Sequence, residues 1–544
     1  MKEVLIIGSG IAGVSAAASC AERGMHVCLL SPFPSERSQS VMAAGGINAV
    51  LEDNNQGDSV ESHIEDTLAG GCNIAGKQAV TGLCDSAEEI IRMLENAGMV
   101  FSRDKDGRIA RRAFGGQSHD RTCYSGASTG KHIVSALVMK CRRYESEGLI
   151  DRRLWSDFHS GLIRDGVCYG ALIYNEATRT LEPYYADAVI VATGGQNALF
   201  GKTTGSTQCD GYTAGKLFMQ GAVLKNLEFI QYHPTTIETA SKRMLISEAA
   251  RGEGGRLYYE ENGKRVYFME EKYGPEGNLM TRDVAAREIY SAGRPVFLDV
   301  SHLEGGIIDS RLSEVRDVCS KYAGIDITRE PIPVAPSVHF FMGGLAVHNN
   351  HETSIRDLYA VGECASIYHG ANRLGGNSLL AAIYSGTVAA KAISERDEKH
   401  DTQDFSGYIE EENKKLISMM DSRSKFPVAY IEQMLAECMN SNLGIIRDEE
   451  SLSKGITETD YLISVADRIN YDSSVLPYFN YSIHGKLALG RACLACAKSR
   501  QESRGSQFRS DYPDMTDQFA YATLIYYDNG EYNVTLDRER QYES

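Results

Sequence analysis

The sequence lacks any apolar run long enough to cross a membrane as a helix. A signal peptide is not expected either, because Met1-Lys2-Glu3 leads straight into an apolar strand. Basic residues are in deficit: 56 Lys and Arg stand against 73 Asp and Glu, a formal charge of -17. This balance argues against nucleic acid and against an anionic membrane surface as the main partner. We therefore expect a cytoplasmic protein in which an anionic ligand would need a local basic pocket.

The sequence also lacks paired cysteine motifs. Its 13 cysteines are scattered, which is typical of reduced cytosolic thiols rather than of a disulfide framework. One Cys-x-x-Cys occurs, between Cys493 and Cys496, within an alanine-rich stretch that favours a helix. With no second pair nearby, we predict neither an iron–sulfur nor a zinc site in this chain.

The N-terminus carries a glycine motif in a specific context. An apolar strand at Val4–Ile7 is followed by Gly8, Gly10 and Gly13, an alanine-rich helix and a second strand at His26–Leu30. This order is typical of dinucleotide-binding folds. The first glycine permits the tight turn, the second lets a pyrophosphate approach the backbone, and the third lets the helix pack on the strand.

One element of that motif is missing. The second strand ends at Ser31, where NAD-binding folds usually have an acid that binds a ribose hydroxyl. Nucleotide-type patterning returns at 358–362 (LYAVG), and Glu363 directly after it has the character of a ribose-binding carboxylate. The departure at Ser31 weakens a simple NAD interpretation, and Glu363 offers a replacement.

A cation and two glycines precede a long apolar run that predicts a buried helix. Arg373 is followed by Gly375–Gly376, Asn377 and Ser378, directly ahead of the run 379–393. Backbone N–H groups and the positive end of the helix dipole would suit an anionic oxygen there. Asn377 and Ser378 could equally be plain helix caps, and the residues alone leave both interpretations open. For Arg373 we favour a binding function.

The 544 residues suffice for two or three domains. From about residue 226 to 335 the chain becomes rich in charge and glycine, which indicates an inserted second domain. The C-terminal part has helical periodicity. Residues 521–536 predict a hairpin that turns at Asp528–Gly530.

Together these features resemble the flavoprotein subunits of succinate dehydrogenase and fumarate reductase, with the related L-aspartate oxidases. The resemblance runs from Gly8 to about Pro513. Its most specific segments are 231–235 (QYHPT), 247–255 (SEAARGEGG), 281–287 (TRDVAAR), 339–344 (HFFMGG) and 369–380 (HGANRLGGNSLL).

The resemblance implies an α/β fold. It consists of a Rossmann-like FAD-binding domain with an inserted α+β capping domain and a C-terminal helical domain. The implied boundaries are 1–225 with 336–395 for the FAD-binding domain, 226–335 for the capping domain, and 396–544 for the helical domain with its terminal hairpin.

A four-carbon dicarboxylate such as fumarate or succinate has two carboxylates to bind. The matching donors are Arg373, His339, His233 and the hydroxyl of Ser247. Arginine offers bidentate recognition by a group that stays charged. We predict that these four residues bind the substrate.

The resemblance assigns the proton donor to Arg282. A free guanidinium has a pKa above about 12, so donation requires that its proton be replaced as it leaves. A chain of Glu248, Arg251 and Arg282 would do this. Glu248 and Arg251 are three residues apart, which puts them on one face of a helical stretch.

The resemblance also places residues along FAD. The pyrophosphate would contact the three motif glycines, and a glycine-rich loop would pack against the flat ring. The other predicted contacts are Ser31 by the adenosine, Asp210 by the cofactor, Glu363 at the ribityl or ribose hydroxyls, Gly45 and Gly46 in the loop, and Ser378 and Leu379 at the isoalloxazine.

The sequence departs from the family at Gln39, where the linked enzymes usually carry a histidine bound covalently to the flavin 8α carbon. Gln39 cannot form that bond. We therefore predict non-covalent FAD at a lower potential, which favours fumarate reduction over succinate oxidation. Ala44 also replaces a usual glutamine.

Three functions are compared. The leading prediction is a fumarate reductase or succinate dehydrogenase flavoprotein that receives electrons from an iron–sulfur protein. That partner could place it at the inner face of the cell membrane. The nearest alternative is L-aspartate oxidase, disfavoured by Gly375–Gly376, where the oxidases have Ala-Ser, and by Met342. The third is a non-catalytic flavin relay, disfavoured by the intact arginines. Direction, electron donor, membrane anchor and oligomeric state stay open.

Overall fold

A five-stranded parallel sheet forms the centre of the molecule. The structure, a computed structural model, describes all residues except 55–56, 127, 241, 398–402, 421–425, 472–476 and 544. The strand order is β19-β10-β1-β2-β6, so the first strand is central. The strands are β1 (Glu3–Ile7), β2 (His26–Ser31), β6 (Ile150–Leu154), β10 (Ala188–Val191) and β19 (Leu358–Ala360).

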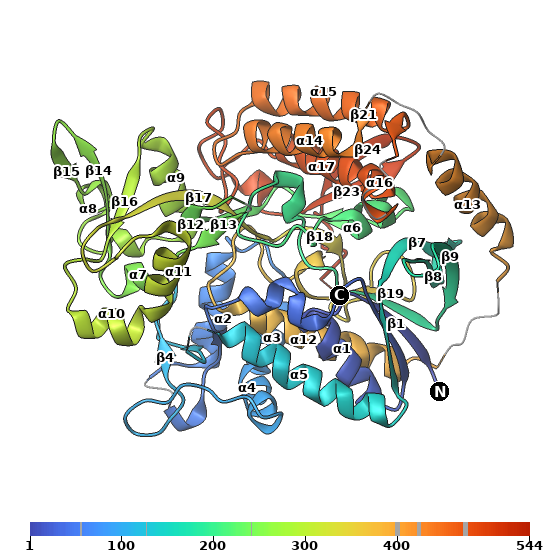
Figure 1. The fold of residues 1–544 in the computed structure, drawn as a ribbon, viewed down its shortest axis with the longest axis horizontal. Helices are drawn as coiled ribbons and strands as arrows, with labels where there is room; N and C mark the ends of the chain where they lie inside the picture. The colour runs from blue at the N-terminus through green and yellow to red at the C-terminus, as the bar shows by residue number, and fades with distance from the viewer. Residues whose placement is uncertain are drawn as a thin grey trace.

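Helices α1 (Ile11–Glu22) and α12 (Asn377–Glu395) pack against each other beside this sheet (Figure 1). They approach closely enough for the Ser15 hydroxyl to donate to the Ile383 carbonyl at 3.0 Å. Gly13 explains the fit of α1 on β1, because a Cβ there would lie 1.9 Å from the Gly8 carbonyl oxygen. Gly8 itself has a φ of +108°, which favours glycine. The predicted strand, glycine motif, helix and strand are therefore confirmed.

Several smaller elements surround this core. The nucleotide-type segment at 358–362 contains strand β19, and the helix that begins after Gly211 is α6. Strand β8 belongs to a separate antiparallel sheet, β7-β8-β9, that was not predicted as a unit. The elements are α2 (Val60–Gly70), α3 (Lys77–Asp85), α4 (Ala87–Asn96), α5 (Thr129–Ser146), α6 (Tyr212–Met219), β3 (Ile47–Asn48), β4 (Arg111–Arg112), β5 (Thr122–Cys123), β7 (Ser156–Arg164), β8 (Val167–Asn175) and β9 (Thr180–Tyr185).

The inserted segment forms a second unit at one end of the molecule, on the left in Figure 1, and we call this unit the cap. It has its own apolar core, from Ile237 to Val334, beside a six-stranded sheet in the order β13-β12-β17-β16-β14-β15. Its elements are β12 (Ile230–Glu238), β13 (Arg243–Leu245), α7 (Ala249–Gly252), β14 (Arg256–Glu261), β15 (Lys264–Val266), α8 (Phe268–Tyr273), α9 (Arg282–Ser291), β16 (Val296–Asp299), α10 (Gly305–Arg311), α11 (Ser313–Ala323) and β17 (Ile332–Phe341).

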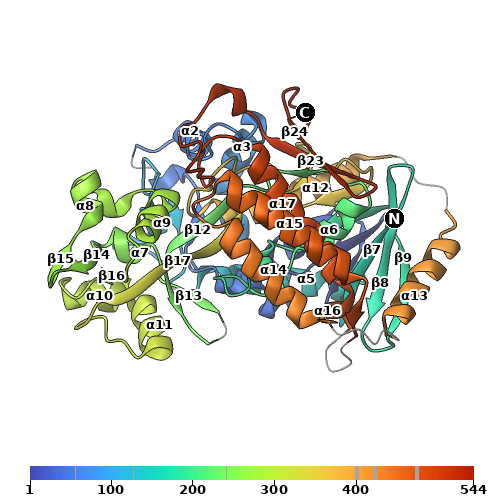
Figure 2. The ribbon, with the colours of Figure 1, turned by 90° about the horizontal axis from the view of Figure 1, so that it is seen from above.

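The C-terminal helices share the core of the parallel-sheet unit instead of forming their own. Helix α17 (Ile483–Ser499) packs on α6, where a Cβ on Gly215 would lie 2.0 Å from the Gly485 carbonyl oxygen. Figure 2 shows α14, α15 and α17 lying side by side over the middle of the molecule. The remaining helices are α13 (Ser406–Met420), α14 (Val428–Asn442), α15 (Glu449–Ala466) and α16 (Pro477–Tyr481), with short strands β21 (Phe426–Pro427) and β22 (Ile469–Asn470).

The predicted hairpin is confirmed as β23 (Thr523–Asp528) and β24 (Glu531–Leu536). It completes a sheet with β11 (Leu224–Lys225), β18 (Gly344–Ala346) and β20 (Ala365–Ser366), and so ties the chain end to the central unit. Cys493 and Cys496 are buried inside α17. Among the described residues no helix is long and apolar enough to cross a bilayer. The predicted fold class is confirmed, while the residue boundaries of the three domains stay predictions.

Candidate active site

One continuous cavity brings together most of the predicted site residues. It runs from the glycine motif, past β12 and β17, to residues of helices α9 and α11 in the inserted unit. Of the predicted residues only Gly13 and Arg251 do not line it. The residues that do are Gly8, Gly10, Ser31, Gln39, Gly45, Gly46, Asp210, His233, Ser247, Glu248, Arg282, His339, Glu363, Arg373, Ser378 and Leu379.

Two helix N-termini face this cavity without side-chain caps. Helix α1 begins after Gly10 and α12 after Gly376, and neither glycine can cap the first turn. Both glycines line the cavity. The Ile11 N–H of α1 donates to Ser40 Oγ at 3.1 Å. The other first-turn N–H groups and the positive ends of the two helix dipoles fit the pyrophosphate and the electron-rich edge of a flavin. The chain therefore offers donors suited to FAD.

Of the two carboxylates predicted near FAD, Asp210 is buried and Glu363 is half-buried. Glu363 accepts a hydrogen bond from the Phe341 N–H at 3.1 Å, and burial raises its pKa to about 7. A Cβ on Gly195 would lie 2.5 Å from Glu363, so the glycine makes room for this carboxyl group. Asp210 is held by the hydroxyl of Tyr478 at 2.8 Å and by Lys486 Nζ at 3.3 Å.

The capping interpretation of Asn377 and Ser378 is wrong. Gly376 is the N-cap of α12, and both residues lie inside the helix. The Asn377 side chain is fully buried, donates to Thr67 Oγ1 at 2.9 Å and accepts from Asn48 Nδ2 at 2.7 Å. Gly376 adopts a φ of +84°, in the left-handed region, and a Cβ there would lie 2.0 Å from Asn48 Oδ1, so both the backbone and the space favour glycine.

Strand irregularities position the two predicted histidines. His233 lies on β12 and His339 on the neighbouring antiparallel strand β17. The register shifts between Gln231 and Tyr232, which leaves His339 as an extra residue on β17, and shifts again after His233. Bulges of this kind redirect a side chain and are frequent beside active sites. The imidazole centroids are 5.3 Å apart.

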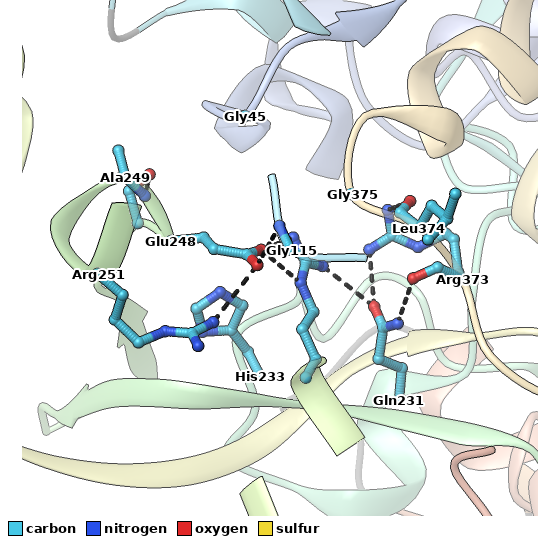
Figure 3. Close-up of polar contacts among 12 residues, drawn as sticks. Gly45, Gly115, Gln231, His233, Glu248, Ala249, Arg251, Arg373, Leu374 and Gly375 are labelled. Carbon is cyan, nitrogen blue, oxygen red and sulfur yellow. Dashed lines mark hydrogen bonds and ion pairs between the residues drawn. The ribbon is translucent and has the colours of Figure 1, made fainter. Parts of the chain in front are cut away.

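Glu248 joins two arginines of the cap. Arg282 donates to Glu248 Oε2 from Nε at 2.9 Å and from Nη2 at 2.8 Å, while Arg251 Nη2 lies 3.4 Å from Oε1 (Figure 3). The Gly115 N–H adds a hydrogen bond to Oε1 at 3.2 Å. Burial alone would raise the pKa of Glu248, but Arg282 and Arg251 outweigh it and the pKa lies below its usual range. The three predicted residues are therefore in contact, but Glu248, and not Arg251 as in the predicted Glu248–Arg251–Arg282 order, lies in the middle.

Gln231 was not predicted to belong to the site. Its Oε1 accepts from Arg282 Nη1 at 3.1 Å and from Arg373 Nη2 at 2.9 Å, so one amide holds both guanidinium groups. In Figure 3 its side chain points toward Arg373. The available signal was its position two residues before His233 on a strand, which places both side chains on one face.

The Gln231 amide is fixed in turn. Its Nε2 donates to the Arg373 carbonyl at 2.7 Å and to Asn372 Oδ1 at 2.8 Å. Asn372 Nδ2 donates to Asp283 Oδ1 at 2.9 Å, and burial raises the pKa of Asp283. Because Asp283 follows Arg282 on α9, this chain of hydrogen bonds connects the cap with the loop that carries Arg373.

Positive charge is in excess at this end of the cavity. In the described part of the chain, Glu248 is the only carboxylate that pairs with Arg251, Arg282 or Arg373. Burial and the charge of Arg282 lower the pKa of Arg373 to about 9. Burial and Arg282 also hold the pKa of both histidines well below its usual range, so the imidazoles are neutral. Such a site suits a small dianion.

The sequence matches two family models. Residues 3–379 match the FAD binding domain family, and residues 432–542 match the fumarate reductase flavoprotein C-terminal family. The first model alone covers more than half of the chain.

Individual relatives agree with these models. The succinate dehydrogenase flavoprotein subunit of Bacillus subtilis is 36% identical over 539 residues, covering 95% of this chain and 92% of its own. A subunit of the fumarate reductase (CoM/CoB) of Methanothermobacter marburgensis is 34% identical and covers 96% of both chains. A structure of Escherichia coli quinol fumarate reductase is 28% identical, with a TM-score of 0.88 over 98% of this chain and 96% of its own. The chain is therefore an FAD-binding oxidoreductase of the succinate dehydrogenase and fumarate reductase flavoprotein family.

Proposed function

We propose that this chain is the flavoprotein subunit of an enzyme that interconverts fumarate and succinate and favours fumarate reduction. The observation that carries the proposal is the excess of guanidinium groups around a cavity that continues into the dinucleotide site. Two of these groups, Arg282 and Arg373, share Gln231, and neutral His233 and His339 lie beside them. A four-carbon dianion matches both the charge and the donors.

The binding roles follow from the contacts. Arg373 offers its guanidinium to one carboxylate, and His233 and His339 offer N–H groups to the other. Ser247 Oγ accepts from the Ala249 N–H at 3.3 Å, which leaves the Ser247 hydroxyl proton to donate to a ligand. FAD, when bound and reduced, supplies a hydride to one alkene carbon.

Arg282 donates the proton that the other alkene carbon requires. Its two contacts with Glu248 fix the guanidinium and place beside it a carboxylate that can take up a proton and pass it to Arg282. Arg251 lies on the far side of Glu248, away from the cavity, and lets a proton reach Glu248 from that side. Arg282 is therefore protonated again as it gives up its proton. A guanidinium is a weak acid, so it can act as a general acid only if its proton is replaced.

Partners and cofactor attachment complete the proposal. Both curated relatives are named subunits, which supports an iron–sulfur partner protein as the electron donor. Such a partner would hold the chain either in the cytoplasm or at the inner face of the cell membrane, with any membrane anchor on the partner side. FAD is held without a covalent bond, because Gln39 lines the cavity where a linking histidine is expected.

The first prediction is fumarate reductase activity of the purified, FAD-loaded protein. Fumarate should rapidly oxidise reduced viologen, since the dye replaces the partner as electron donor. L-Aspartate with oxygen should give no peroxide. Peroxide from aspartate without fumarate-dependent dye oxidation would indicate an L-aspartate oxidase, and neither signal would indicate a non-catalytic flavin relay.

The second prediction concerns Arg282→Ala. The variant should lose turnover by about a hundred- to ten-thousandfold, because proton donation is typically worth 10² to 10⁴ and Arg251, the other arginine beside Glu248, does not line the cavity. Flavin content and dicarboxylate affinity, measured by absorbance titration, should largely persist. Arg287→Ala on the same helix is the matched control, since Arg287 stacks on Phe508. Substantial turnover by Arg282→Ala would remove Arg282 as the proton donor.

The third prediction concerns the flavin bond. After precipitation in acid and centrifugation, the yellow colour should remain in the supernatant, because the Gln39 amide cannot bond to the flavin 8α carbon. The same sample kept at neutral pH should retain the colour on the protein. Colour in the acid pellet would show a covalent attachment and refute the assignment of Gln39.

A further inference from the structure

We infer that Thr204 is a positioning residue for His339, setting which imidazole nitrogen offers a proton to the substrate carboxylate. The inference deepens the proposed function and rests on it, because it takes His339 as a dicarboxylate ligand. Thr204 carries no charge and lies in a loop that the sequence did not single out, and it lines the same cavity as His339.

The contacts of Thr204 are specific. Its Oγ1 lies 2.9 Å from His339 Nδ1 and 3.1 Å from the Val338 carbonyl oxygen, and its backbone N–H donates to that carbonyl at 3.2 Å. The side chain is buried. Thr204 therefore forms hydrogen bonds both to β17, at the residue before His339, and to the His339 imidazole.

This grip falls on the irregular part of β17. His339 is the extra residue at the register shift, so strand pairing with β12 leaves its orientation less constrained than that of its neighbours. The loop that carries Thr204 is fixed from the cap side as well, because the Arg243 N–H donates to the Thr203 carbonyl at 3.1 Å. The Thr204 hydroxyl therefore contacts the side chain, His339, whose orientation the strand pairing constrains least.

A hydroxyl has a single proton, which sets two possible arrangements. If Thr204 donates to the Val338 carbonyl, His339 must carry its proton on Nδ1 to bond with Oγ1, and Nε2 is an acceptor. If the hydroxyl turns to donate to Nδ1, the imidazole proton is on Nε2, and Nε2 can donate a hydrogen bond to a substrate carboxylate. Rotation of one hydroxyl therefore accompanies the change from a resting to a ligand-binding imidazole.

The imidazole must change tautomer because it does not gain a charge. Burial, Arg282 and neighbouring His233 hold the pKa of His339 well below its usual range, so a second proton is disfavoured. His233 differs, because its Nδ1 is placed against the backbone of Thr235, 3.1 Å from the carbonyl oxygen and 3.3 Å from the N–H. Of the two histidines, only His339 has its Nδ1 in contact with a side-chain hydroxyl.

The test compares three variants of the FAD-loaded protein. Thr204→Val removes the hydroxyl at nearly constant volume, and Thr204→Ser restores it. Thr236→Val is the matched control, because Thr236 is buried in the same sheet and its hydroxyl donates to the Ala335 carbonyl of β17 at 2.7 Å rather than to a histidine. Flavin content and melting temperature are recorded for each.

Malonate, an unreactive diacid, is titrated into the oxidised proteins by calorimetry, and kcat and KM for fumarate are measured separately. Thr204→Val should weaken malonate binding and raise KM about five- to tenfold, as expected for one lost orienting hydrogen bond, with a smaller change in kcat. Thr204→Ser and Thr236→Val should bind like the unchanged protein.

Two results would overturn the inference. Either Thr204→Val binds malonate normally, or Thr204→Ser fails as badly as Thr204→Val, which would assign the effect to packing of the methyl group. Lower stability of Thr204→Val does not obscure the outcome, because Thr204→Ser and Thr236→Val control for it. Absence of malonate binding and of fumarate turnover in the unchanged protein would instead contradict the proposed function itself.

Discussion

The sharing of one carboxylate by two buried guanidinium groups is the constraint on which the site depends. Glu248 pairs with Arg282 and Arg251, and in the described part of the chain no carboxylate forms an ion pair with Arg373. Buried charge without a partner is costly, so the protein stabilises it with neutral acceptors, above all the Gln231 amide. A bound dianion would supply the missing negative charge.

The fold brings these groups together from separate units. Arg282 begins α9 in the inserted cap, Gln231 and the two histidines lie on β12 and β17, and Arg373 precedes α12 of the central unit. The hydrogen bond between Asn372 and Asp283 crosses from the central unit to the cap. The N-termini of α1 and α12, which begin after Gly10 and Gly376, face the same cavity. The cofactor site and the anion site therefore share one cavity.

The sequence predicted what depends on local chemistry. The glycine motif, the helix after Gly376 and the hairpin at Asp528–Gly530 are encoded by neighbouring residues, and all three are present. Gln231 and Thr204 were missed because an amide or a hydroxyl is uninformative until the strand pairing is known. The bulge at His339 and the core shared by the C-terminal helices arise from contacts between distant segments, which no local pattern records.

The central claim is that the site is short of negative charge and is completed by a diacid. The most direct measurement is the melting temperature of the oxidised, FAD-loaded protein at constant ionic strength with malonate or with propionate, a monoacid of the same length. The account predicts that the melting temperature rises steadily with malonate concentration, as it does for a ligand that binds only the folded state. Propionate should leave the melting temperature unchanged. Equal responses to the two acids would contradict it.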